Sequence, residues 1–261
     1  MDQKKDKDVL REIIETGSEI SGGIAGSIIG ALTAGPVGLI LGGSAGPIIT
    51  KVFKEIGLEM RNRMLAPREL IRMGAVYAFA INKLRQAETS GAKLRSVEYF
   101  NGDKARSPGE EILEGVILNA QREYEERKVK FLGNLYANIC LDSSITREHA
   151  SQLIRLTSNV SFRQLCILQA LRLVGVDFKS KLDGVGKIVQ EDLILELRDL
   201  QQKRLINISE LLSPAPPSGR PIDFNSIRIT TSGVNFCKML SLEEIEEEEL
   251  SAVKEFLMPR T

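Results

Sequence analysis

The stretch from Ile20 to Thr50 reads ISGGIAGSIIGALTAGPVGLILGGSAGPIIT and contains no charged residue, although 27% of the whole chain is charged. Small residues recur in it at every fourth position. They form a glycine ladder, which consists of Gly22, Gly26, Gly30, Ala34, Gly38, Gly42 and Gly46. Because positions four apart stack along one face of a helix, the ladder predicts a helical face with a groove that carries no large side chains.

A groove of this kind lets helix backbones approach closely, which is typical of helices that associate inside a membrane. In water, each glycine within a helix costs about 1 kcal/mol relative to alanine, so solvent alone would not favour the pattern. The sequence therefore predicts that the ladder residues contact a lipid bilayer, a partner helix or both.

The pair Gly35-Pro36 divides the stretch, because Pro36 cannot donate a helical hydrogen bond. Each half holds about 15 residues, or roughly 22 Å of helix, whereas a membrane span needs about 20 apolar residues. Three shapes remain open: one kinked span, a shallow re-entrant hairpin, or two helices buried in a soluble protein. A nucleotide-binding loop is not indicated, because neither GxGxxG nor GK[ST] occurs here. We favour membrane or oligomer insertion over a soluble buried hairpin.

Composition narrows the class of protein. The 261 residues carry a formal net charge of +0, so no overall field attracts nucleic acid or anionic lipid. Tryptophan, the usual interfacial anchor of membrane proteins, is absent. The first nineteen residues are rich in charge, which argues against a cleavable signal peptide. Three widely spaced cysteines without a CxxC motif indicate reduced, buried thiols in a protein made in the cytosol.

After the ladder, apolar residues at helical spacing predict a helical core over residues 51–158. Ser107, Pro108 and Glu110 form a capping box at one helix start, and Thr146 and Ser161 are expected to cap two further helices. Residues 89–106 lack periodicity and form the longest candidate loop, in which Val97, Tyr99 and Phe100 suggest a short strand. The basic residues just after the ladder are open to two interpretations, a contact with phospholipid headgroups or a solvated helix face; they are Lys51, Lys54, Arg61, Arg63, Arg68 and Arg72.

The run from Glu110 to Leu171 resembles the helical core of bacterial abortive-infection proteins of the alpha type. The shared cues are ILE-x5-A-x3-YE in one helix, NLYAN in the next, a small helix with a histidine, and a capped Ser-x-x-Gln-x-x-x-Leu helix. The resemblance covers about a quarter of the chain and consists of packing patterns. It implies bacterial defence against phage by killing or arresting the infected cell. The idea that the glycine ladder is the killing element is our own inference.

The C-terminal third resembles a winged helix-turn-helix domain. A helix over 189–204 precedes the strand Leu205–Ile208, a Pro/Gly/Ser turn, a returning strand over 226–230, and a helix opened by Thr231-Ser232-Gly233. DNA binding is not expected, because the presumed recognition helix carries Glu191, Asp192, Glu196 and Asp199 among its basic residues. We favour a protein-binding role. An acidic helix is expected to follow from Ser241, as a solvated face or a docking site for a basic partner.

Catalytic chemistry is not indicated. His149, the only histidine, falls at the third position of a short helix, and nothing in the sequence orients it toward Cys140. The acidic residues Glu110, Glu111 and Glu114 are explained by the first turn of a capped helix. No metal-ligand spacing occurs, so we expect no enzyme activity, no cofactor and no metal.

These observations predict a mainly α protein with four parts. Residues 1–50 hold a polar helix and the glycine-zipper membrane or oligomerisation segment, 51–158 the helical core, 159–240 the winged-helix-like domain, and 241–261 the acidic helix. The predicted function is an anti-phage effector that oligomerises and disrupts the inner membrane after a trigger, such as a phage protein, is sensed by the C-terminal half. It would be cytoplasmic when inactive and at the inner membrane when active. The alternative is a cytosolic winged-helix transcriptional regulator or protein-binding adaptor with the glycine-rich hairpin buried.

Overall fold

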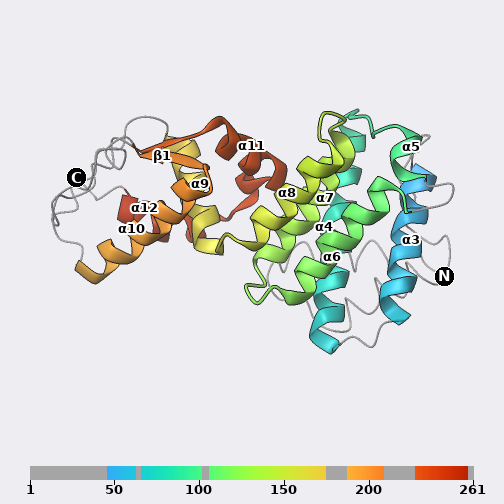
Figure 1. Ribbon diagram of the computed structural model, residues 1–261, viewed down its shortest axis with the longest axis horizontal. Helices are drawn as coiled ribbons and strands as arrows, with labels where there is room; N and C mark the ends of the chain where they lie inside the picture. Colours follow the sequence, from blue (N-terminus) through green and yellow to red (C-terminus); the bar gives the residue numbers. More distant parts are fainter. Residues whose placement is uncertain (1–45, 63–65, 102–105, 175–186, 209–226, 258–261) are drawn as a thin grey trace. The chain divides into compact units, whose positions relative to one another are not determined.

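The computed structural model describes residues 46–62, 66–101, 106–174, 187–208 and 227–257, and these ranges are mainly helical, as predicted (Figure 1). The helices are α3 (Gly46–Asn62), α4 (Pro67–Thr89), α5 (Val97–Phe100), α6 (Pro108–Arg122), α7 (Lys128–Leu141), α8 (Arg147–Ser158), α9 (Phe162–Val174), α10 (Lys187–Gln202), α11 (Thr231–Leu240), the 3-10 turn η3 (Leu242–Glu244) and α12 (Glu247–Leu257). Two strands, β1 (Ile206–Ile208) and β2 (Ile227–Ile229), complete the described elements. The chain divides into two compact units between Ser158 and Asn159.

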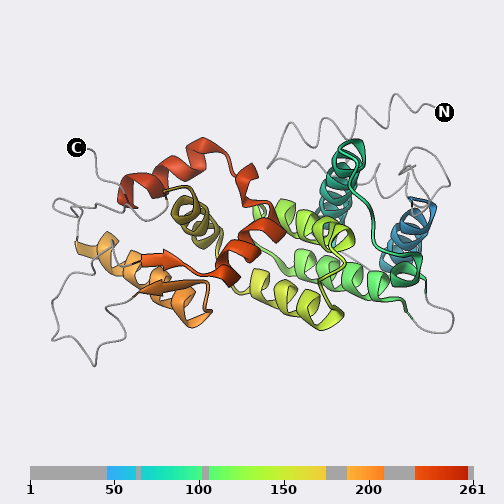
Figure 2. The same cartoon turned by 90° about the horizontal axis from the view of Figure 1, so that it is seen from above.

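The N-terminal unit is built around the pair α4 and α7, which share its most extensive contact. α4 is buried on all sides over Met73–Ile81, which agrees with the broad apolar face expected from its sequence. α6 packs against both members of this pair, and α8 packs against α6 and α7. α3 and the short α5 complete the unit by packing on α6, and both views place α3 at its edge (Figures 1 and 2).

The helix starts in this unit follow the predicted capping chemistry. The backbone N–H of Ser107 donates to Glu110 Oε2 at 2.7 Å, and the backbone N–H of Glu110 donates to Ser107 Oγ at 3.3 Å. This reciprocal box satisfies two donors that a helix start would otherwise leave unpaired. Thr146 caps α8 in a simpler way, since its hydroxyl accepts from the backbone N–H of His149 at 3.2 Å. Both predictions are confirmed.

The C-terminal unit is built around α9, which packs against α10, α11, η3, α12 and β2. Its predicted cap is confirmed, because the backbone N–H of Gln164 donates to Ser161 Oγ at 3.1 Å. β1 and β2 pair antiparallel with Ile206 opposite Ile229 and Ile208 opposite Ile227, as the predicted returning strand requires. The buried isoleucine side chains of this ribbon contribute to the core.

The start of α11 fixes the strand pair to the end of α10. The Thr230 hydroxyl donates to Arg204 O at 2.7 Å and also accepts from the backbone N–H of Gly233 at 3.0 Å. A β-carbon on Gly233 would lie 2.7 Å from Ile229 Cγ1 and would also collide with the Leu205 carbonyl, so only glycine fits this crossing.

Several details differ from the sequence-based expectations. Val97–Phe100 forms a helical turn rather than a strand, and this turn packs on α6 with both Tyr99 and Phe100 buried. Tyr124, whose YE motif the family resemblance assigns to the α6 helix, lies beyond the end of α6 at Arg122 and is 82% exposed. The acidic helix starts at Glu247 rather than near Ser241, which adopts a left-handed conformation at the end of α11.

Candidate functional site: the contact between α3 and α6

The predicted membrane and oligomerisation residues fall largely outside the described part of the chain. Gly22, Gly26, Gly30, Ala34, Gly38 and Gly42 lie there, and Gly46 is the first residue of α3. α3 is therefore the described element that follows the ladder directly in the chain, and we take the seat of α3 as the candidate functional site.

The inner face of α3 is apolar and fully buried. Its members share helical spacing and are Ile49, Val52, Phe53, Ile56 and Met60. The exposed side chains of the helix include Lys51, Lys54 and Glu55. The alternation identifies α3 as an amphipathic helix that is docked on the unit by one side only.

Phe53 makes the aromatic contacts of this face. Its ring centroid lies 5.0 Å from that of Tyr77 in α4 and 5.5 Å from that of Tyr136 in α7, the latter in an edge-to-face arrangement. Aromatic pairs in such geometries contribute about 0.5–1.5 kcal/mol beyond their buried area. Phe53 therefore anchors α3 to the central helix pair.

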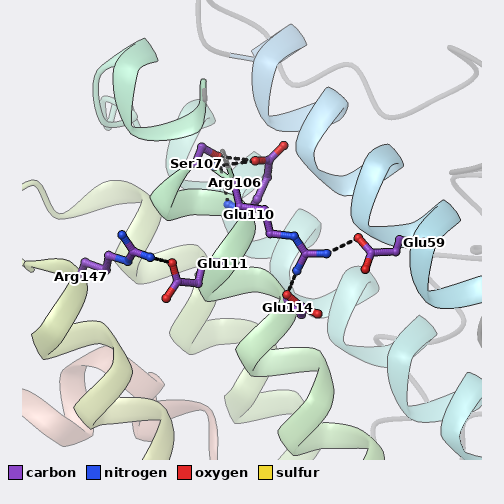
Figure 3. A network of polar contacts seen from close by, with 7 residues as sticks. All are labelled: Glu59, Arg106, Ser107, Glu110, Glu111, Glu114 and Arg147. Atoms are coloured by element: carbon purple, nitrogen blue, oxygen red, sulfur yellow. Dashed lines mark hydrogen bonds and ion pairs between the residues drawn. The ribbon is translucent and has the colours of Figure 1, made fainter. Parts of the chain in front are cut away.

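Arg106 supplies the polar contact between α3 and α6. Its guanidinium forms ion pairs with Glu59 of α3 and with Glu114 of α6 (Figure 3). The Arg106 side chain is about one-third exposed, so each ion pair contributes only about 0.2–1 kcal/mol in high-dielectric surroundings. The sequence reading placed Arg106 in a loop without a role, and its position directly before the capping Ser107 was the available signal.

Two carboxyl groups, from Glu55 of α3 and Glu110 of α6, meet across the same contact. Burial and the hydrogen bond with Glu110 raise the pKa of Glu55 above its usual value, although Lys51 opposes this. Burial also acts to raise the pKa of Glu110, but hydrogen bonds from the Ser107 backbone, from Glu55 and from the Ser107 side chain lower it overall. Glu55 is therefore the member of the pair that retains a proton more readily.

The other carboxylates near the start of α6 form structural ion pairs. Glu111 forms an ion pair with Arg147 at the start of α8, away from α3 (Figure 3). Glu110, Glu111 and Glu114 thus lie on one helix turn, and each is engaged with a cap or an arginine.

The cysteine thiols are not activated as nucleophiles. Cys140, Cys166 and Cys237 are buried thiols, and burial raises the pKa of Cys140 and of Cys237 to about 12. Such thiols stay protonated at neutral pH and are poor nucleophiles. His149 is exposed at the third position of α8, as the sequence predicted.

Within the described ranges, no group of three or more His, Cys, Asp or Glu side chains is placed to hold a metal ion. None of the helices described here is both long enough and apolar enough to cross a membrane.

Arg95 is a second residue that the sequence reading missed. Its guanidinium donates to the Ile145 carbonyl at 2.6 Å and lies 3.8 Å from the centroid of the Tyr99 ring. Its backbone N–H donates to Cys140 O at 2.9 Å. These contacts hold the segment before α5 against the end of α7 and the turn that precedes α8, so an arginine fixes part of the predicted loop.

In the C-terminal unit, α10 presents side chains of mixed character. Asp192, Leu195 and Arg198 are exposed, with Leu195 at 61%. Asp199 accepts from Gln164 Nε2 of α9 at 2.6 Å and pairs with Lys203. Lys203 and Gln164 keep the pKa of Asp199 below its usual value, against the opposing effect of its burial.

Comparison of the chain with protein-family models, with curated proteins and with solved structures finds no match.

Proposed function

We propose that this protein is a membrane-perturbing effector whose active element is the glycine ladder and whose restraint is the docked helix α3. The observation that carries the proposal is continuity: the uncharged run Ile20–Thr50 extends into α3, whose apolar face is buried on the helical unit. In this proposal, docking of α3 keeps the ladder from acting on the membrane. When α3 detaches, the ladder can reach a bilayer and a second copy of the chain.

The charge pattern of α3 supports this arrangement. Lys51 and Lys54 lie on its exposed face, next to the end of the uncharged run. Basic residues beside an apolar segment gain about 1 kcal/mol each near an anionic membrane surface. They would favour the membrane-bound state without being needed for docking, since Phe53 and Arg106 make the docking contacts.

The biological setting proposed is defence against phage. The run Glu110–Leu171, which resembles abortive-infection proteins of the alpha type, corresponds to α6, α7, α8 and most of α9. The seat of α3 lies on the first of these helices. In this proposal the effector is cytoplasmic until triggered, oligomerises through the ladder, and disrupts the inner membrane of the infected cell.

The C-terminal unit is proposed as the sensor, with a winged-helix-like arrangement that binds protein. The order α9, α10, β1, β2 and α11, with an antiparallel strand pair, supports that assignment. The exposed residues of α10 include an acid, a leucine and an arginine, a mixture that favours protein contact over phosphate contact. A phage protein is the candidate trigger.

Deleting Ser21–Ala45 tests the proposal, because it removes the ladder from Gly22 to Gly42 and leaves all of α3, including Gly46, in place. The shortened chain should unfold cooperatively like the full chain but should no longer depolarise bacterial membranes when produced at high level. Depolarisation by the shortened chain would overturn the proposed mechanism.

The alternative function is a cytosolic winged-helix regulator or adaptor, which the strand pair and its capped helix α11 favour. In that case the full chain should remain in the soluble fraction, fail to depolarise membranes, and behave like the shortened chain in both assays.

A further inference from the structure

The hydroxyl group of Tyr77 is buried without a hydrogen-bond partner beneath α3. Tyr77 is 0% exposed, and its oxygen is an unpartnered polar atom of the described structure. Gly57 of α3 lies above it, since a β-carbon on Gly57 would stand 3.5 Å from that oxygen. The ring of Phe53, also from α3, lies 5.0 Å from the Tyr77 ring.

Tyr136, the other tyrosine beside Phe53, is different. It is equally buried, but its hydroxyl donates to the Gly109 carbonyl at 3.3 Å. The two tyrosines therefore share burial, ring chemistry and contact with Phe53, and they differ in whether the hydroxyl is satisfied. Burying a hydroxyl without a partner is unfavourable, whereas a satisfied one is nearly neutral or mildly favourable.

We propose that the unpaired Tyr77 hydroxyl makes α3 a releasable helix, because docking of α3 removes this hydroxyl from water and gives it nothing in return. Detaching α3 exposes the hydroxyl and restores its hydration. Docking of α3 is thus less favourable by one desolvation penalty. The rest of the unit, including the α4–α7 pair, keeps its full stability.

The position of α3 fits this role. α3 lies at the edge of the unit and packs mainly on α6 and α5, and its charged contact with α6 runs through the partly exposed Arg106 (Figures 1 and 3). Its removal would leave the packing among α4, α6, α7 and α8 in place. Local opening of an edge element at lower free energy than global unfolding is common in proteins. As a means of regulation, this inference rests on the proposed function. Its physical content concerns only how strongly α3 docks.

Replacing Tyr77 with phenylalanine removes only the unpaired oxygen. In the full chain, hydrogen exchange of the α3 amides should slow by about 5- to 150-fold, which is a penalty of about 1–3 kcal/mol converted at 1.4 kcal/mol per tenfold. Amides in α8 report on the rest of the unit and should change much less. Tyr136→Phe is the control, and it should leave α3 exchange unchanged or make it faster.

Two results would overturn the inference. Unchanged or faster α3 exchange in Tyr77→Phe would show that the hydroxyl does not oppose docking. An equal slowing in α3 and α8 would show that α3 opens only with the whole unit. Neither measurement uses a membrane or a living cell, so slower α3 exchange together with an inactive ladder would refute the proposed function and leave this inference standing.

Discussion

Gly133 of α7 crosses Phe79 of α4 so closely that a β-carbon on the glycine would lie 2.8 Å from the β-carbon of the phenylalanine. The same β-carbon would lie 2.8 Å from the Val76 carbonyl oxygen, and backbone cannot move aside as a flexible side chain can. We expect Gly133→Ala to destabilise the protein by about 1–3 kcal/mol, as overpacking does. Gly115→Ala in α6 is the matched control, because its β-carbon would meet Ile154 Cδ1 at 3.4 Å and alanine favours the helix. Urea denaturation measures both, and equal midpoints would contradict the prediction.

Removing the Arg106 charge should loosen α3 specifically. Arg106→Gln loses the ion pairs with Glu59 and Glu114, so α3 amides should exchange faster by a factor of about 1.5–5. The effect should shrink as salt rises, because the contact is partly exposed. Arg147→Gln is the control, since Arg147 pairs with Glu111 and has no part in the α3 contact. Equal effects of the two substitutions would argue against the assigned role of Arg106.

The docking of α3 should depend on pH through Glu55. The pKa of Glu55 is raised in the docked state, so its contribution to docking is fully present below its usual pKa and is lost as the pH rises through the raised value. Glu110 has a lowered pKa, so its stabilising contribution has the opposite pH dependence. That contribution is present above the usual pKa of a glutamate and is lost as the pH falls through the lowered value. Acidification from neutral pH through the raised pKa of Glu55 should therefore increase α3 protection, once intrinsic exchange rates are taken into account.

Glu55→Gln tests the same relationship, because it mimics the protonated side chain and should flatten this pH dependence. Lys51→Gln should move it to higher pH, since Lys51 holds the pKa of Glu55 down. If α3 protection instead falls on mild acidification, the pairing of Glu55 with Glu110 is wrong.

For the ladder, hydrophobicity and shape predict different outcomes. A leucine at Gly30 or Gly38 raises apolarity, so membrane association should persist. Its side chain fills the groove, so close helix contact, oligomer formation and killing should be lost. Ile28→Leu, which lies off the ladder and is similar in volume, should be nearly silent. Crosslinking in membranes measures oligomer formation, and cell viability measures killing. If the glycine variants kill as well as the wild type, the ladder is not required for killing.

The C-terminal unit should bind no specific DNA sequence. On α10 the exposed Arg198 is offset by the exposed Asp192, and Lys203, directly after the helix, is already paired with Asp199, so little net positive charge is available for phosphate. Electrophoretic mobility shifts with random-sequence DNA at moderate salt should show no tight, sequence-selective complex. Such a complex would favour the regulator over the effector.

Local chemistry in the sequence predicted much of the helical framework. The Ser107–Glu110 and Ser161–Gln164 boxes and the Thr146 cap depend on residues three apart, so a single sequence is enough to recognise them. The strand pair was recognisable for a similar reason, since short isoleucine-rich runs flank a turn-forming segment.

Contacts between distant segments were harder to predict. Val97–Phe100 became a helical turn because α6 buries two adjacent aromatic side chains, a tertiary effect invisible in the local pattern. Leu195 continues the apolar sequence of α10 yet remains exposed. The role of Arg106 depends on Glu59, which lies 47 positions away, and sequence spacing carries no information about such a pair.

The burial of all three cysteines has a practical consequence. Because Cys140, Cys166 and Cys237 lie in the cores of the two units, the folded chain offers thiol reagents no exposed native target. A cysteine introduced at the exposed Lys54 would then accept a single fluorescent label on α3. A second label on α8 would turn the separation of the two helices into an optical signal, readable in solution and on vesicles, without replacing any native thiol.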